Sequence, residues 1–445
     1  MRPWIFRSLV TLALLWNPLA NAFDRFIAHG GPIKGIAYSE ADNLLVSASF
    51  DYTAVVWRAD TMVELKQLVA HTAAVNTATF SPDGQWLATG GDDGMIFLWA
   101  VSELKDSTAI ARPRVLQGHQ AKIVHLAFSP DSQLLSSSSW DHRVGIWSVD
   151  DPSKLPRFFT GHQGPVNAAL FSQDGTHLYS AGADGHIRYW RVASGEYIRS
   201  PIRNGFGVNV MALDYDLGVL AYGGANGVMK AFQVDQPEQE MELWLGGPPV
   251  LSVSLDGPTQ TMAFGTAEGR VVIADAVKGE ITHDFQAVKG PVWAMCLTAG
   301  SEHLVMAGLD DWVTRIPLGD FTVPTQLPDR DRRFHPDEPI DNGQRQFARK
   351  CSVCHTLTPS SARRAGPTLY GVFGRKVGEV ADYPYSPELL EMDLVWNEDS
   401  IDRLFRDGPD VVTPGSKMPI QRIKAQKDRD DLISYLKRAT APTQP

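Results

Sequence analysis

The pattern of apolar and polar positions changes once along the 445-residue chain. Over residues 23–318 it consists of short, β-prone apolar runs, such as Val75–Phe80, Trp86–Gly90 and Met95–Trp99. The segments that join them, Ser81–Gly84 and Asp92–Gly94, are rich in Asp and Gly, which favour tight turns. This alternation predicts short antiparallel strands connected by turns.

The strand pattern repeats at about 42 residues, a spacing within the range of repeat architectures. Four repeats contain a His, a hydroxyl residue, an Asp and a Trp at matching offsets. These sets are His29, Ser47, Asp51, Trp57; His71, Thr89, Asp93, Trp99; His119, Ser137, Asp141, Trp147; and His162, Ser180, Asp184, Trp190. A buried carboxylate and imidazole at such positions must satisfy each other's hydrogen bonds.

Three further repeats keep the spacing but lose the tetrad. Tyr222, Phe264 and Met306 replace the hydroxyl residue, and the Trp position becomes Phe232, Ala274 and Ile316. We expect these units to close by apolar packing instead.

The first 318 residues therefore resemble the WD-repeat β-propeller family, on the evidence of the four tetrads. The resemblance implies an all-β, seven-bladed propeller over residues 23–318 and a ring closed by a strand from the other end of the chain. Blade seven has a third strand at Trp312–Ile316 and then a Pro-rich stretch. We expect Phe23–Ala28 to supply its fourth strand.

Beyond a Pro-rich linker at residues 319–340, the pattern becomes helical and predicts a small all-α domain at residues 341–440. Asp341 can cap a helix that ends near Cys351, and Asn397 can cap a helix at Glu398–Asp407. Asp428 can cap a third helix. The fold class is thus a multidomain chain, a propeller followed by a helical domain.

The sequence Cys351-Ser-Val-Cys354-His355 carries the sharpest chemistry. Two thiols one helical turn apart can form thioethers with a haem, and the adjacent His then lies under the iron as an axial ligand. A redox dithiol would need a thioredoxin-like setting, which is missing, and zinc would need a second ligand pair. The motif predicts one covalently attached haem c.

The surrounding residues resemble the mitochondrial-type class I cytochromes c. The segments that carry this resemblance are Gly343 and Phe347, Gly366–Arg375, Tyr383–Tyr385, Trp396, Pro414–Met418 and Asp431–Leu436. The resemblance implies His355 and Met418 as the axial iron ligands. It also implies that Pro367 accepts the His355 ring N–H, that the final helix packs on Gly343, and that Arg375, Tyr385, Trp396 and Ser416 face the haem propionates. Leu389 replaces a polar residue that is common in the family, which predicts a drier pocket.

The N-terminus reads as an export signal. Arg2 and Arg7 precede a short apolar run, and Ala20-Asn21-Ala22 is a small-residue cleavage site. An uncleaved anchor is the alternative, and either places the mature chain outside the cytoplasm, with the periplasm as the expected location. No later segment is long and apolar enough to span a membrane. The net charge of −10 comes from the repeats, which argues against a nucleic-acid partner.

Three functions fit these features. The first is an exported one-electron carrier in which the propeller docks redox partner proteins. The second is a periplasmic oxidoreductase whose propeller holds a substrate or cofactor and passes electrons to the haem. The third is a haem-based redox or gas sensor, which would require Met418 to leave the iron. We favour the carrier, because two strong axial ligands leave no open site on iron.

Overall fold

The computed structural model describes residues 23–27, 29–106, 109–151, 153–319, 341–352, 354–359, 366–381, 383, 385–416, 418 and 421–441. The predicted signal at residues 1–22 and nearly all of the predicted linker lie outside these ranges. Within them, no helix is long and apolar enough to cross a membrane.

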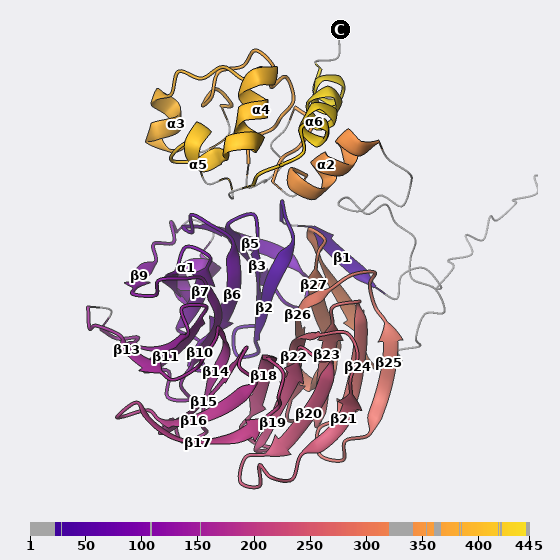
Figure 1. Ribbon diagram of the computed structural model, residues 1–445. Coiled ribbons are helices and arrows are strands. Elements are labelled where there is room, and N and C mark those ends of the chain that lie inside the picture. Colours follow the sequence, from indigo (N-terminus) through magenta and orange to yellow (C-terminus); the bar gives the residue numbers. More distant parts are fainter. Residues whose placement is uncertain are drawn as a thin grey trace, which may run out of the picture.

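Seven four-stranded antiparallel sheets form the first domain, a seven-bladed β-propeller (Figure 1). Blades one to three comprise β2 (Ile33–Ser39), β3 (Leu44–Ser49), β4 (Thr53–Arg58), β5 (Val63–Val69); β6 (Val75–Phe80), β7 (Trp86–Gly91), β8 (Met95–Ala100), β9 (Arg114–Gln117); and β10 (Ile123–Phe128), β11 (Leu134–Ser139), β12 (Arg143–Ser148), β13 (Arg157–Thr160). Blades four to six comprise β14 (Val166–Phe171), β15 (His177–Gly182), β16 (His186–Arg191), β17 (Glu196–Arg203); β18 (Val208–Asp214), β19 (Val219–Gly224), β20 (Val228–Gln233), β21 (Met241–Leu245); and β22 (Val250–Asp256), β23 (Thr261–Thr266), β24 (Arg270–Asp275), β25 (Ile281–Gln286). The strands predicted for the second repeat match β6, β7 and β8 to within a residue.

The ring is closed by the N-terminal strand, as predicted. Blade seven contains β26 (Val292–Leu297), β27 (His303–Gly308), β28 (Trp312–Pro317) and β1 (Asp24–Ile27), with a short 3-10 turn, η1 (Ala299–Ser301), before β27. β1 pairs antiparallel with β28, from Asp24 opposite Arg315 to Ile27 opposite Trp312. β2 packs against β6 on one side and against β26 on the other, so blades one and seven are neighbours.

In blades one to four the tetrads form the expected hydrogen-bond chains. In blade three, His119 Nδ1 lies 2.8 Å from Asp141 and His119 Nε2 lies 2.7 Å from Ser137 Oγ, which also accepts the indole N–H of Trp147 at 2.7 Å. The other three blades repeat the same contacts. Each chain is buried, so its polar atoms are satisfied internally.

The expectation that blades five to seven close by packing is confirmed, and in blade five Tyr222 and Phe232 are both buried in an apolar cluster. Phe264 in blade six and Met306 and Ile316 in blade seven are buried in apolar clusters. Blade five adds a polar contact to this packing, because the Tyr222 hydroxyl donates to Glu240, which also pairs with Lys230 at 3.1 Å. The phenol that replaces the tetrad hydroxyl is long enough to reach a carboxylate on the outer edge of its blade.

The first strands of all seven blades line a central channel. His125 on β10 lies in the channel wall. Burial lowers its pKa to about 4. Cys296 on β26 is buried in an apolar cluster. The insertion in the second repeat forms a short helix, α1 (Val101–Lys105).

Five helices form the second domain: α2 (Asn342–Lys350), α3 (Pro387–Glu391), α4 (Glu398–Asp407), α5 (Pro409–Val412) and α6 (Gln426–Ala439). Asp341 and Asn397 cap α2 and α4 as predicted. Asp428 does not cap α6, because the helix begins two residues earlier and Ala425 occupies the cap position. In the first turn Asp428 instead accepts a hydrogen bond from Asn342 at 2.9 Å, which ties α6 to α2.

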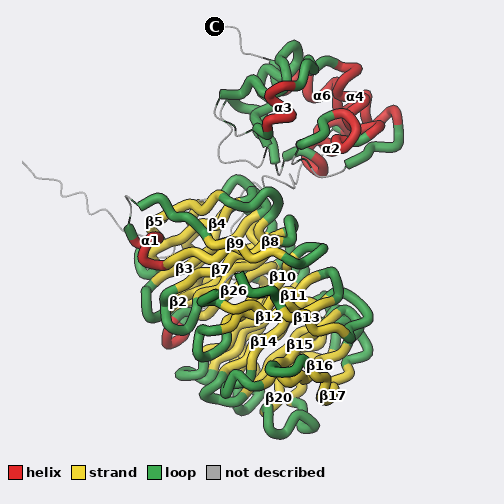
Figure 2. Tube along the Cα trace, turned by 90° about the vertical axis from the view of Figure 1, so that its left-hand side faces the viewer, coloured by secondary structure: helices red, strands yellow, loops and turns green. Residues whose placement is uncertain are grey.

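α6 crosses α2 at close range, as the sequence predicts. A Cβ on Gly343 would lie 2.1 Å from the Asp431 carbonyl oxygen, so only glycine allows this approach. Figures 1 and 2 show the helical domain beyond one face of the propeller.

Candidate functional site

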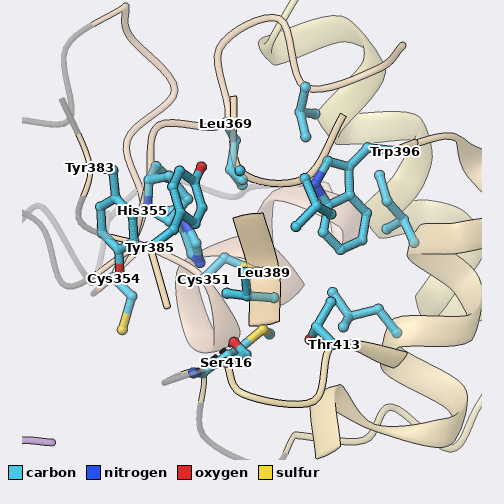
Figure 3. Close-up of a pocket in the computed structure, with 18 of the residues that line it drawn as sticks. Cys351, Cys354, His355, Leu369, Tyr383, Tyr385, Leu389, Trp396, Thr413 and Ser416 are labelled. Carbon is cyan, nitrogen blue, oxygen red and sulfur yellow. Dashed lines mark hydrogen bonds between the residues drawn. The ribbon is translucent and has the colours of Figure 1, made fainter. Parts of the chain in front are cut away.

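The helical domain encloses a pocket into which the predicted site residues converge. Its lining includes all nine of them: Cys351, Cys354, His355, Pro367, Arg375, Tyr385, Trp396, Ser416 and Met418. Figure 3 shows His355 and Tyr385 on one side of this pocket and Trp396 and Thr413 on the other. The apolar residues between them belong to the core of the domain, so the pocket is the centre of the fold.

The two cysteines and the histidine are positioned by the end of α2. The Cys351 amide donates to the Phe347 carbonyl at 2.8 Å, and the His355 amide donates to the Cys351 carbonyl at 2.9 Å. These bonds continue the helical curvature through the motif, so both thiols and the imidazole line one cavity. Burial and the neighbouring Cys354 raise the pKa of the Cys351 thiol to about 12, so this thiol does not ionise on its own near neutral pH.

The His355 ring is held in one orientation. Its Nδ1 lies 2.7 Å from the Pro367 carbonyl oxygen, the partner that the sequence predicts. A carbonyl can only accept, so Nδ1 carries the proton and Nε2 has the lone pair that can bind a metal. Gly366 lies against the ring, where a Cβ would come within 2.3 Å of Cε1. This glycine and proline therefore fix the imidazole from its outer side.

Met418 reaches the pocket from a different segment, the loop after α5. The Met418 amide donates to Ser416 Oγ at 3.0 Å, and the Ser416 amide donates to the Thr413 carbonyl at 3.0 Å. Gly415 allows the turn because it adopts a φ of 81°. Ser416 thus holds the loop that presents the Met418 thioether. This role differs from the predicted one, which was to face the haem propionates.

The residues predicted to face the propionates have additional contacts. Arg375 donates to the Tyr370 carbonyl at 2.8 Å and to the Thr368 carbonyl at 2.6 Å, so it also fixes the loop behind the pocket. The Trp396 amide donates to the Arg375 carbonyl at 2.9 Å, which brings these two side chains to the same wall. Burial raises the pKa of the Tyr385 phenol, which keeps this hydroxyl protonated as a donor.

Sequence reasoning missed several polar residues of the lining, of which Gln421 and Tyr52 are the most informative. Gln421 follows the Met418 loop, and its buried Oε1 has no hydrogen-bond partner among the described residues. Tyr52 belongs to the propeller, and no motif in the helical domain points to it. The one signal for Tyr52 was its position after Asp51, where other repeats carry glycine.

The pocket fits a haem c. Two thiols next to one imidazole supply covalent attachment and one axial ligand, and a thioether supplies a second. Leu389 is buried and lines the pocket, so its wall is apolar at the position where the sequence predicts less water. In the described ranges no cluster of three or more His, Cys, Asp or Glu side chains is placed to hold a metal ion.

Comparisons with known proteins agree with this geometry. The family model for the WD domain, G-beta repeat, matches residues 22–58, 62–100, 111–148 and 153–191, and the model for cytochrome c matches residues 340–440. Cytochrome c of Gibberella zeae is 37% identical over 101 residues, which are 23% of this chain and 94% of that protein. Cytochrome c of Gossypium barbadense is 40% identical over 100 residues, covering 22% and 88% of the two chains.

Each of these relatives corresponds to the helical domain alone, and the four matched repeats correspond to the blades that contain tetrads. The chain therefore belongs to the cytochrome c family, through a C-terminal domain that follows a WD-repeat β-propeller.

Proposed function

We propose that the protein is an exported carrier of single electrons and that its propeller binds a partner protein. The observation that carries this proposal is the convergence of Cys351, Cys354, His355 and Met418 on one pocket. Haem c in this pocket supplies a one-electron couple at its iron. Electron transfer and protein interaction are the activities that the two families suggest, and the predicted export signal supports a location outside the cytoplasm.

The protein's own residues set the conditions in the pocket. His355, with Nδ1 bonded to Pro367, presents Nε2 as a ligand, and Met418 presents a neutral thioether that favours the reduced metal. Leu389 and Trp396 exclude water from the wall, which also favours the form with lower charge. Together they predict a high reduction potential and no exchangeable ligand position.

Absorption spectra of the full chain, expressed with haem-attachment machinery, test this proposal. We expect a Met-to-iron charge-transfer band in the ferric protein and no carbon monoxide binding in the ferrous protein. The matched variant Met418→Ala should lose the band and bind carbon monoxide. Carbon monoxide binding by the unaltered chain would contradict the carrier and favour an enzyme or a sensor.

Export has its own test. Fractionation of cells expressing the full chain, followed by N-terminal sequencing, should yield a periplasmic protein that begins at Phe23. Recovery from the cytoplasm with Met1 intact would contradict export while leaving the haem site unaffected.

A further inference from the structure

One residue of the haem pocket comes from the propeller. Tyr52 lies in the turn between β3 and β4, directly after the tetrad residue Asp51, and its side chain lines the same pocket as Cys354 and Tyr383. The other lining residues that the structure describes all belong to the helical domain. Tyr52 is thus a point at which the propeller contacts the haem-binding domain.

Tyr52 has an unfavourable backbone conformation. Its φ is 72°, in the left-handed region that side chains with a Cβ rarely adopt. Four other blades have glycine at the same position, also with positive φ: Gly94, Gly185, Gly227 and Gly269. Only His142 of blade three shares the strain among the described blades, with a φ of 70°. A strained side chain where glycine would serve indicates a role for that side chain.

The electrostatic surroundings of Tyr52 come from both domains. Burial raises the pKa of its phenol, and the neighbouring Cys354 and Tyr383 of the helical domain and Asp92 of the propeller raise it further. Burial likewise raises the pKa of Tyr383 to about 12, with Cys354 among the causes. Two half-buried phenols therefore lie near the same cysteine, one from each domain.

The propeller face around Tyr52 is suited to contact with another protein surface. The residues just before the tetrad Asp are Phe50, Asp92 and Trp140 in blades one to three, but alanine in blade four and at the equivalent positions of blades five and six. Trp140 is 46% exposed, and the Lys122 ammonium lies 3.4 Å from its ring centroid. Exposed aromatic rings with flanking cations are typical of protein interfaces.

We propose that this face of blades one to three is a docking surface for the chain's own haem domain, with Tyr52 as its central contact. The propeller is acidic, with more net negative charge than the −10 of the whole chain, and the helical domain is slightly basic, so their attraction is favourable. Both surfaces are on one chain, which keeps them at effective concentrations of the order of millimolar. A weak contact is therefore sufficient for docking.

Docking controls which partners reach the haem. Tyr52 lines the pocket together with Cys354, so we expect the docked propeller to keep a protein-sized partner away from this edge. A small reagent needs much less open surface, so docking should not slow its reaction. The contact thus deepens the proposed function by making access of a redox partner depend on undocking.

Tyr52→Gly in the full, haem-loaded chain tests the docking surface. Glycine fits the backbone, so the propeller should stay folded, with an unchanged melting temperature. We expect a larger radius of gyration by small-angle X-ray scattering. We also expect oxidation of the reduced chain by a purified ferric cytochrome c to become about tenfold faster, equivalent to about 1.4 kcal/mol, with no change in its rate with ferricyanide.

His142→Gly is the matched control for relief of backbone strain, because His142 lies two blades from Tyr52 and does not line the pocket, and this variant should keep the two domains docked. Tyr52→Phe keeps the ring and should stay docked. A radius of gyration and oxidation rates for Tyr52→Gly equal to those of His142→Gly would overturn the proposal. The radius of gyration tests docking even if the haem transfers no electron to either oxidant. Failure of the docking proposal can therefore be distinguished from failure of the proposed electron transfer.

Discussion

The propeller builds one polar unit four times in separate blades, whereas the helical domain has one pocket whose walls are also its core. Cys351, Ile401, Leu404, Phe405 and Leu436 belong both to the lining and to the main apolar cluster of that domain. Loss of one tetrad therefore leaves six blades and their sheets intact. Loss of the group that fills the pocket removes the centre of the helical fold.

Removal of both attachment cysteines should give the largest effect. In the Cys351→Ser/Cys354→Ser variant, the apolar walls lose the haem that fills them, and a domain of about 100 residues has little other core to compensate. We expect loss of helical circular dichroism while the propeller melts at its usual temperature. Retention of the full helical signal without haem would contradict the idea that the pocket is the core.

Loss of one tetrad hydroxyl should have a smaller, local effect. Ser137→Ala leaves His119 Nε2 and Trp147 Nε1 buried without their shared partner, which should cost about 2–4 kcal/mol. The control is the neighbouring Ser138→Ala, because Ser138 Oγ is buried and has no partner among the described residues. Denaturant unfolding should show a lower stability for the first variant only, and equal losses would argue against the tetrad.

The propeller should lose folding stability in mildly acidic solution, as the pH falls from about 6.5 to 4. The pKa of His125 is lowered from 6.5 to about 4 by burial, so between these values the unfolded chain binds a proton that the folded chain does not. Stability must then fall as pH decreases from about 6.5 to 4. His125→Gln should make this decline shallower, whereas the exposed His142→Gln should not. Equal slopes for the two variants would contradict burial as the cause.

The smallest effect is expected in blade five. Tyr222→Phe removes the hydroxyl that donates to Glu240 but keeps the buried ring, and Lys230 still pairs with the carboxylate. We expect a loss of about 0.5–1.5 kcal/mol in denaturant unfolding. Phe264 occupies the same place in blade six without a polar partner, so Phe264→Ala is the contrast, with an expected cost of about 3–5 kcal/mol for the cavity.

Local patterns in the sequence were enough to predict the repeats and two helix caps, and the resemblance to the WD-repeat family added the strand that closes the ring. These features depend on spacing and on side chains that bond to nearby backbone, as Asp341 does to the Gln344 amide. Asp428 shows where such reasoning fails. Its carboxylate could cap a helix by itself, but contact of α6 with α2 favours an earlier start and a bond to Asn342.

For the site, the sequence by itself determined which thiols and which imidazole are offered to a cofactor, because they form a Cys-x-x-Cys-His motif, and the resemblance to cytochromes c added Met418. Only the tertiary structure decided how these atoms are supported. Ser416 bonds to the Met418 amide, and Arg375 holds two carbonyls behind the pocket. Tyr52 lies nearly 300 residues before the motif. Contacts between distant segments have no fixed spacing along the chain, so only folding reveals them.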